Sequence, residues 1–214
     1  MNALEALGRY ARRPRAAPAV EVCELCAAPA GERHRHVVDL ERRAVCCACA
    51  TCAMLFVQSG GGGRYRTIPE RVVVEPALSL AQEQWAELQI PVGLAFVFFS
   101  SSVRRWVALY PSPAGAIESE LPLEAWRALA EQNALVASAE PDVEALLVHA
   151  ERGAPTCECL LAPIDACYEL VGRIRRRWKG LDGGDAVRDE IAAFLDQLRA
   201  RGKPLRRKDS GDAR

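Results

Sequence analysis

The sequence has no excess of charge of either sign and no long apolar run, and both absences exclude classes of protein. Lys+Arg and Asp+Glu each number 28 in 214 residues, so the formal net charge is zero. A neutral chain gives no electrostatic support for general binding to nucleic acid or to an anionic membrane. No stretch reaches the roughly 20 apolar residues of a membrane span, and residues 1–18 lack the apolar core of a secretory signal. We therefore expect a cytoplasmic protein that binds neither membranes nor nucleic acid.

Recognisable catalytic signatures are also missing. The chain contains no Ser-His-Asp constellation, no dinucleotide-binding fingerprint and no kinase signature. Four consecutive glycines at 60–63 are not followed by the Gly-Lys-Ser/Thr of a phosphate loop, so they indicate a connector. These absences favour a binding protein over an enzyme.

Cysteine, in contrast, is abundant and clustered. The chain has 9 cysteines, and most of them lie between Cys23 and Cys52. An odd number suits a complete disulfide framework poorly, and the cytoplasm keeps thiols reduced. Closely spaced cysteines in that compartment are typical of metal or redox sites.

The spacing of the clustered cysteines predicts a metal site. Cys23 and Cys26 form one C-x2-C pair, and Cys49 and Cys52 form another after 22 intervening residues. Each pair can direct two thiolates at one ion, with Zn–S distances of about 2.3 Å. Between the pairs, residues 34–40 and 44–49 have strand character and flank a turn. A knuckle, a hairpin and a second knuckle make a zinc-ribbon-like module over 21–58, whose folding would depend on bound zinc.

Other ligands and another metal stay open at this point. Cys47 shares a strand face with Cys49 and can replace it as a ligand, whereas Cys46 is expected to be a small buried side chain. His34 and His36 also share a face, either as ligands or as hydrogen-bonding neighbours of the site. Iron, in a mononuclear or cluster site, is the alternative metal. Rubredoxin-type knuckles usually carry glycine beside the cysteines, and this chain does not, so we favour zinc.

The rest of the chain predicts an α+β domain. Strands are expected at 71–76, 93–99, 104–110, 143–150 and 157–164. Helices are expected from Leu80, over 123–132, over 165–179 with Asp165 as cap, and from Asp185 as cap. Sequential hairpins form antiparallel sheet, which helices can cover. We predict a two-layer sandwich of antiparallel hairpins and helices with four or five strands.

Composition divides the chain into five segments. They are a flexible basic arm at 1–20, the cysteine module at 21–58, a Gly-rich connector at 59–70, the α+β domain at 71–201, and a disordered tail at 202–214.

Two further groups of residues are candidate sites. Cys167 with His149 could form a nucleophile pair, but apolar neighbours favour Cys167 as a core residue. Arg173, Arg175 and Arg176 form a basic run on a predicted helix. Such a run is usually a solvated face, and the sharper alternative is a surface that binds an acidic partner.

Several stretches together resemble an uncharacterised bacterial family, a domain of unknown function. They are CELC, HRHVVDLERR, CACATC, GGRYRTIPERV, IPVGLAF, YPSPAGAIES, PDVEALLV and PIDACYELVGRIRRRWKG. The resemblance covers about residues 22–198. Members of that family occur beside genes for nickel–iron hydrogenases, so the resemblance implies an accessory role near hydrogenase assembly or electron transfer. It supplies no known reaction and no catalytic residue.

The leading hypothesis is therefore a zinc-binding accessory protein that binds a client protein, such as a hydrogenase subunit or maturation factor. The alternatives are an iron-binding electron-transfer protein at the same cysteines and a small enzyme that uses the α+β domain. A zinc-ribbon nucleic-acid binder is disfavoured by the neutral charge.

Overall fold

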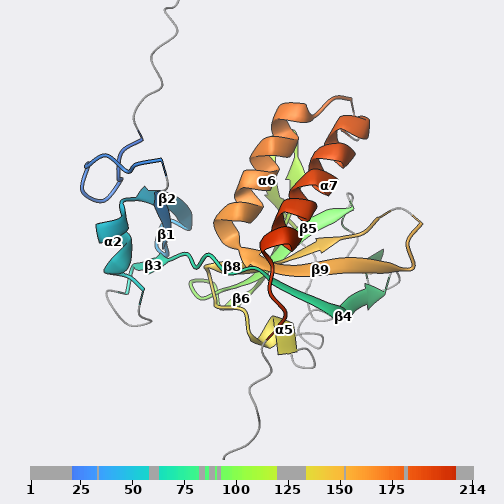
Figure 1. The fold of residues 1–214 in the computed structure, drawn as a ribbon, viewed down its shortest axis with the longest axis horizontal. Coiled ribbons are helices and arrows are strands. Elements are labelled where there is room, and N and C mark those ends of the chain that lie inside the picture. The colour runs from blue at the N-terminus through green and yellow to red at the C-terminus, as the bar shows by residue number, and fades with distance from the viewer. Residues whose placement is uncertain are drawn as a thin grey trace, which may run out of the picture.

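The computed structural model describes residues 21–32, 34–57, 63–81, 85–86, 90, 93–119, 134–151, 153–180 and 183–205. They form a small sheet near the N-terminus and a large sheet with helices (Figure 1). The predicted arm at 1–20 and the predicted helix at 123–132 lie outside the described residues, as does most of the predicted tail. Within the described ranges, no helix is long and apolar enough to cross a membrane.

The small sheet contains the predicted hairpin and one further strand. Strands β1 (Arg35–Asp39) and β2 (Ala44–Ala48) pair antiparallel, as predicted. Strand β3 (Tyr65–Thr67) pairs antiparallel with the other edge of β1. The sheet order is β2-β1-β3. Helix α2 (Ala50–Met54) follows β2. The small sheet therefore includes residues of the segment that the sequence predicted to be a connector.

The large sheet is antiparallel throughout, as predicted for this α+β chain. Its six strands lie in the order β4-β9-β8-β5-β6-β7. They are β4 (Val73–Ala81), β5 (Leu94–Ser100), β6 (Arg105–Ser112), β7 (Gly115–Glu118), β8 (Glu144–His149) and β9 (Thr156–Pro163). The prediction of four or five strands was too low, because β7 forms a short edge strand beside β6.

The apolar run of β5 is buried on both faces, as its composition predicts. Alternate residues point to opposite faces of a sheet. Phe96 lies on the face that helices α6 (Ile164–Arg177) and α7 (Gly184–Arg201) cover. Val97 lies on the opposite face, in a cluster with Trp85 and with Leu135 of α5 (Ala134–Ala137). Each face of the large sheet therefore has its own apolar cluster.

Three local predictions were wrong, and at Leu80 strand pairing overrode the short-range helix signal. The predicted helix at Leu80 falls in β4, where Ser79 and Leu80 pair with β9. The N-caps of α6 and α7 are Pro163 and Gly183, not Asp165 and Asp185. Helix α6 follows directly on β9, which leaves Asp165 inside the first turn, where its carboxylate contacts another part of the chain.

The small sheet packs against the large sheet. Val38 of β1 belongs to the same buried cluster as Phe98 and Ile164. Arg66 of β3 donates a hydrogen bond to the Pro141 carbonyl at 3.0 Å, and its guanidinium lies 3.7 Å from Asp142. One apolar core therefore continues from the small sheet into the large domain.

A buried carboxylate of the large sheet binds the segment that connects β3 to β4. Glu144 of β8 is fully buried, and its oxygens accept hydrogen bonds from Arg71 at 2.5 and 2.7 Å. The Glu140 backbone N–H donates a further bond to Glu144 at 2.8 Å. Burial of a carboxylate is costly unless it is paired and hydrogen-bonded, so Arg71 is required for this arrangement.

We expect Arg71→Met to lower the free energy of unfolding by about 3 kcal/mol, because it leaves the buried Glu144 without its counter-charge. Urea denaturation measures the change. The control is Arg188→Met, which removes an exposed pair with Asp185 and should cost less than about 1 kcal/mol. An Arg71→Met loss no larger than that of the control would contradict the role given to Arg71.

The turn that carries the first two cysteines contains a strained residue. The Ala27 N–H donates to the Cys23 carbonyl at 2.8 Å, and Ala27 has a φ of 61°. This left-handed conformation costs a residue with a Cβ about 1–2 kcal/mol. The turn therefore forms against a local backbone preference.

Ala27→Gly should stabilise the protein by about 1 kcal/mol, since glycine adopts this φ without the Cβ penalty. Ala28→Gly is the matched control, because Ala28 is not among the described residues with a positive φ. The control should be neutral or destabilising. Thermal unfolding compares the two variants, and equal effects would show that Ala27 carries no strain.

Candidate metal centre

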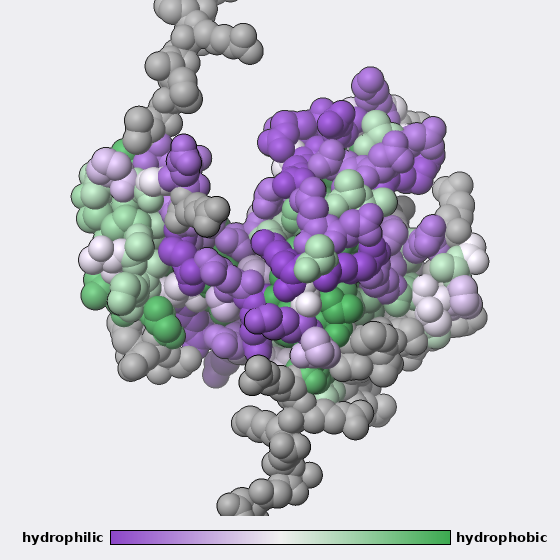
Figure 2. Space-filling model, in the orientation of Figure 1, coloured by the Kyte–Doolittle hydropathy of each residue, from purple (hydrophilic) through white to green (hydrophobic). Residues whose placement is uncertain are grey.

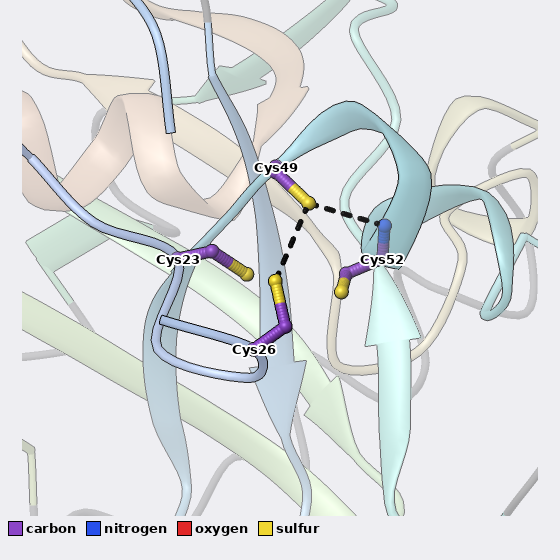
Figure 3. A group of neighbouring side chains, drawn as sticks. All are labelled: Cys23, Cys26, Cys49 and Cys52. Carbon is purple, nitrogen blue, oxygen red and sulfur yellow. Dashed lines mark hydrogen bonds between the residues drawn. The ribbon is translucent and has the colours of Figure 1, made fainter. Parts of the chain in front are cut away.

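The four predicted ligand cysteines come together in the folded chain. The Sγ atoms of Cys23, Cys26, Cys49 and Cys52 all lie within 4.8 Å of one another. Cys26 Sγ and Cys49 Sγ are 3.8 Å apart. Four sulfurs around a zinc ion at about 2.3 Å would be about 3.8 Å apart. Figure 3 shows the side chains pointing toward a common centre, so the donor set and its spacing fit a tetrahedral ion.

Two turns supply these ligands. Cys23 and Cys26 lie in the turn that precedes β1, while Cys49 and Cys52 lie where β2 passes into α2. Cys49 is the N-cap of α2, and its Sγ accepts a hydrogen bond from the Cys52 N–H at 3.5 Å. The x2 spacing thus places both sulfurs of the second pair on one side of a helix start.

Hydrogen bonds favour a thiolate at one of the four positions. Burial raises the pKa of Cys23, but backbone N–H groups, led by that of Cys49, outweigh it and lower this pKa to about 6. Side-chain hydrogen bonds with Cys26 and Cys49 raise the pKa of Cys52 to about 12. The thiolate is the form that binds metal, and the buried Cys23 is the position where the protein itself stabilises it.

The three alternative ligands form a separate cluster. His34, His36 and Cys47 have side-chain donor atoms that all lie within 4.8 Å of one another. Cys47 faces these histidines instead of joining the four cysteines. Cys46 belongs to the opposite face of β2 and packs against the buried cluster that contains Val37.

Each histidine of this second cluster is held through its Nδ1 atom. His36 Nδ1 lies 2.9 Å from Asp165 Oδ2, and this hydrogen bond raises the pKa of His36. His34 Nδ1 lies 3.3 Å from the Gly31 carbonyl and 3.1 Å from Glu21 Oε2. The two Nε2 atoms face each other at 3.1 Å. Sequence reasoning missed Asp165 here, because no local signal relates it to a histidine 129 residues away.

The remaining cysteines are core residues. Cys157, Cys159 and Cys167 are all buried. Burial raises the pKa of Cys167 far above its usual range. His149 lies at the C-terminal end of β8, where its register partner is Glu158. Helix α6 begins beyond the other end of β8, where Glu144 lies opposite Pro163. The structure therefore favours the core role for Cys167 over the pairing with His149.

The three candidate arginines of α6 do not have equivalent surroundings. Arg173 lies between α6 and α7, with its guanidinium 2.7 Å from Glu169 and 3.6 Å from Glu190. It also stacks over the ring of Phe194 at 4.9 Å. Arg175 and Arg176 are exposed. Arg173 is therefore held by contacts within the chain, whereas Arg175 and Arg176 are accessible to a partner.

A pocket of about 400 Å³ lies between the two sheets. Its walls include Arg43 and Glu118, which form an ion pair at 3.6 Å. They also include Asp142, whose Oδ1 accepts a hydrogen bond from the Ser101 N–H at 2.8 Å. The other carboxylate oxygen of Asp142 is buried without a hydrogen-bond partner, and the Arg66 guanidinium lies 3.7 Å from it. The pocket is part of the contact between the two sheets.

Comparison with known proteins agrees with the expected membership of an uncharacterised family. No curated protein and no solved structure matches the chain. A family model described as a family of unknown function matches residues 22–202, which include both sheets and both side-chain clusters. The chain therefore belongs to this family of unknown function, DUF5947.

Proposed function

We propose that the four cysteines bind a structural zinc ion in a zinc-ribbon-like unit, and that the protein is an accessory protein that binds a client protein. The observation that carries the proposal is the convergence of Cys23, Cys26, Cys49 and Cys52 to within 4.8 Å. Four protein ligands complete the tetrahedral coordination sphere of an ion and leave no coordination position for a substrate, which is typical of structural zinc.

The size of the small sheet supports a structural role for the ion. The cluster that surrounds the cysteines has four buried residues among those described, namely Cys23, Val37, Ala48 and Ala53. Apart from Val37, these are small side chains, and they bury little apolar area. Metal binding at such a site contributes folding energy directly. Zinc would thus hold the two cysteine turns and α2 in place.

An exposed apolar surface beside the cysteines supports client binding. Met54, Leu55 and Val57 follow Cys52 closely, and their exposed fractions are 75%, 67% and 65%. Figure 2 shows apolar surface over the small sheet and α2. Clustered exposed apolar side chains mark interaction sites more often than single ones do. Because α2 carries Cys49 and Cys52 at its start, the ion would also fix the position of this surface.

The client follows from the family resemblance. We propose a hydrogenase subunit or a hydrogenase maturation factor, in the cytoplasm, as the protein that docks on the small sheet. An iron-binding electron-transfer protein is the second candidate, since iron also accepts four thiolates. The identity of the bound metal distinguishes these two candidate functions.

Single Cys→Ser substitutions at positions 23, 26, 49 and 52 should each abolish stoichiometric metal and loosen the small sheet, because each removes one ligand. Cys46→Ser is the matched control and should keep the ion. Elemental analysis of tag-free protein from its own host counts the metal, and the visible spectrum identifies it, since zinc thiolate is colourless there and iron thiolate absorbs. Full metal in the Cys49 variant would disprove this ligand set, and iron in the wild type would favour electron transfer.

Leu55→Glu should reduce capture of the client from host extract, because it places a charge in the apolar surface. Val103→Glu is the matched control, since Val103 is an exposed apolar residue of the large domain. A pull-down with quantitative mass spectrometry should recover a hydrogenase component with the wild type and the control, and less with Leu55→Glu.

The same experiment tests the basic surface of α6. Arg175→Glu with Arg176→Glu should weaken capture if the client is acidic there, while Arg173 is left unchanged because it supports the contact between α6 and α7.

Equal recovery with Leu55→Glu and the wild type would exclude the apolar surface. Absence of every hydrogenase component would exclude the client that the resemblance implies.

A further inference from the structure

We propose that His34, His36 and Cys47 form a second metal site, separate from the four cysteines, that takes a divalent ion of the zinc type and leaves one coordination position open. The ligand set is two imidazoles and one thiolate. The inference does not rest on the proposed function, because it uses different residues and a different face of the small sheet.

The strand register builds the site. His36 of β1 lies directly opposite Cys47 of β2, and residues so paired have side chains on the same face. His34 directly precedes β1, and its ring contacts that of His36, with the centroids 4.7 Å apart. The result is the observed cluster, in which the donor atoms lie within 4.8 Å of one another.

The hydrogen bonds at Nδ1 decide what the Nε2 atoms can do. Asp165 Oδ2 and Glu21 Oε2 are carboxylate oxygens, and the Gly31 carbonyl is an acceptor only. Each imidazole therefore keeps a proton on Nδ1 to donate to these oxygens, at 2.9 Å for His36 and 3.1 Å and 3.3 Å for His34. When both rings are neutral, each presents an Nε2 lone pair to the other.

Two lone pairs at 3.1 Å repel each other unless a cation lies between or beside them. A proton can satisfy the pair by making one ring an imidazolium. A metal ion satisfies both rings at once and also uses the nearby Cys47 sulfur. A histidine that binds metal through Nε2 and donates Nδ1–H to a carboxylate or carbonyl is the usual arrangement in metal sites.

The site lies at the contact between the two sheets, which indicates its chemistry. Asp165 belongs to the first turn of α6 in the large domain, whereas His36 and Cys47 belong to the small sheet and His34 directly precedes β1. The His36 side chain is 30% exposed, so solvent or a small ligand can reach the cluster. Three protein ligands with an accessible fourth position are typical of exchangeable or reactive zinc sites, unlike the closed four-cysteine site.

Metal stoichiometry with cobalt as the probe tests the site. Tag-free protein that holds one tightly bound zinc ion is titrated with Co²⁺ at neutral pH. A second equivalent should bind with a thiolate-to-cobalt absorption band, because Cys47 supplies the sulfur. His34→Ala, His36→Ala and Cys47→Ala should each lose the second equivalent and keep the tightly bound zinc, which shows that they remain folded. Cys46→Ala, next in sequence but on the opposite face, should retain both.

Asp165→Ala should weaken the second equivalent by about 10–100-fold without changing the first, since the carboxylate orients His36. The proposal is overturned if the wild type binds no second equivalent in several-fold excess of Co²⁺, which would assign the pair of histidines to a shared proton. It is also overturned if Cys47→Ala and Cys46→Ala bind the second equivalent equally. Loss of the tightly bound zinc on Cys23→Ser leaves this inference intact, so the two sites are tested separately.

Discussion

Convergence of four sulfur atoms is the constraint on which the arrangement of the small sheet depends. Cys23 and Cys26 precede β1, and Cys49 and Cys52 follow β2, so their contact joins both ends of the hairpin. The buried side chains around them are few and mostly small. Apolar burial alone therefore contributes little to holding the two cysteine turns together. The proposed tetrahedral ion would supply the missing stabilisation.

The small sheet is also fixed from its other face, by the large domain. Val38 continues the core that α6 and α7 share with the large sheet, and His36 contacts Asp165 of α6 at 2.9 Å. One face of the hairpin thus supports the four cysteines, while the opposite face carries the two histidines and Cys47. Metal binding on either face would therefore affect the contact between the sheets. Through α2 it would also affect the position of the exposed apolar residues that follow Cys52.

Much of this organisation could be predicted from local sequence. The C-x2-C spacing predicted which cysteines converge, and the apolar runs predicted β5, β6, β8 and β9, because both signals act over a few residues. Pairings between distant segments could not be predicted. The strand at Leu80 forms by pairing with β9, and β3 forms by pairing with β1. Asp165 looked like a helix cap because its partner, His36, is remote in sequence. Likewise, Cys47 resembled a competitor of Cys49 until the register placed it opposite His36.

Anomalous diffraction at the zinc absorption edge would test the central claim most directly. Crystals of the protein purified from its own host should give one strong peak at the centre of Cys23, Cys26, Cys49 and Cys52, at about 2.3 Å from each sulfur. The peak should vanish on the low-energy side of the edge. Disulfide bonds between these cysteines with no peak, or a peak that only two of the four sulfurs approach, would contradict a structural zinc site.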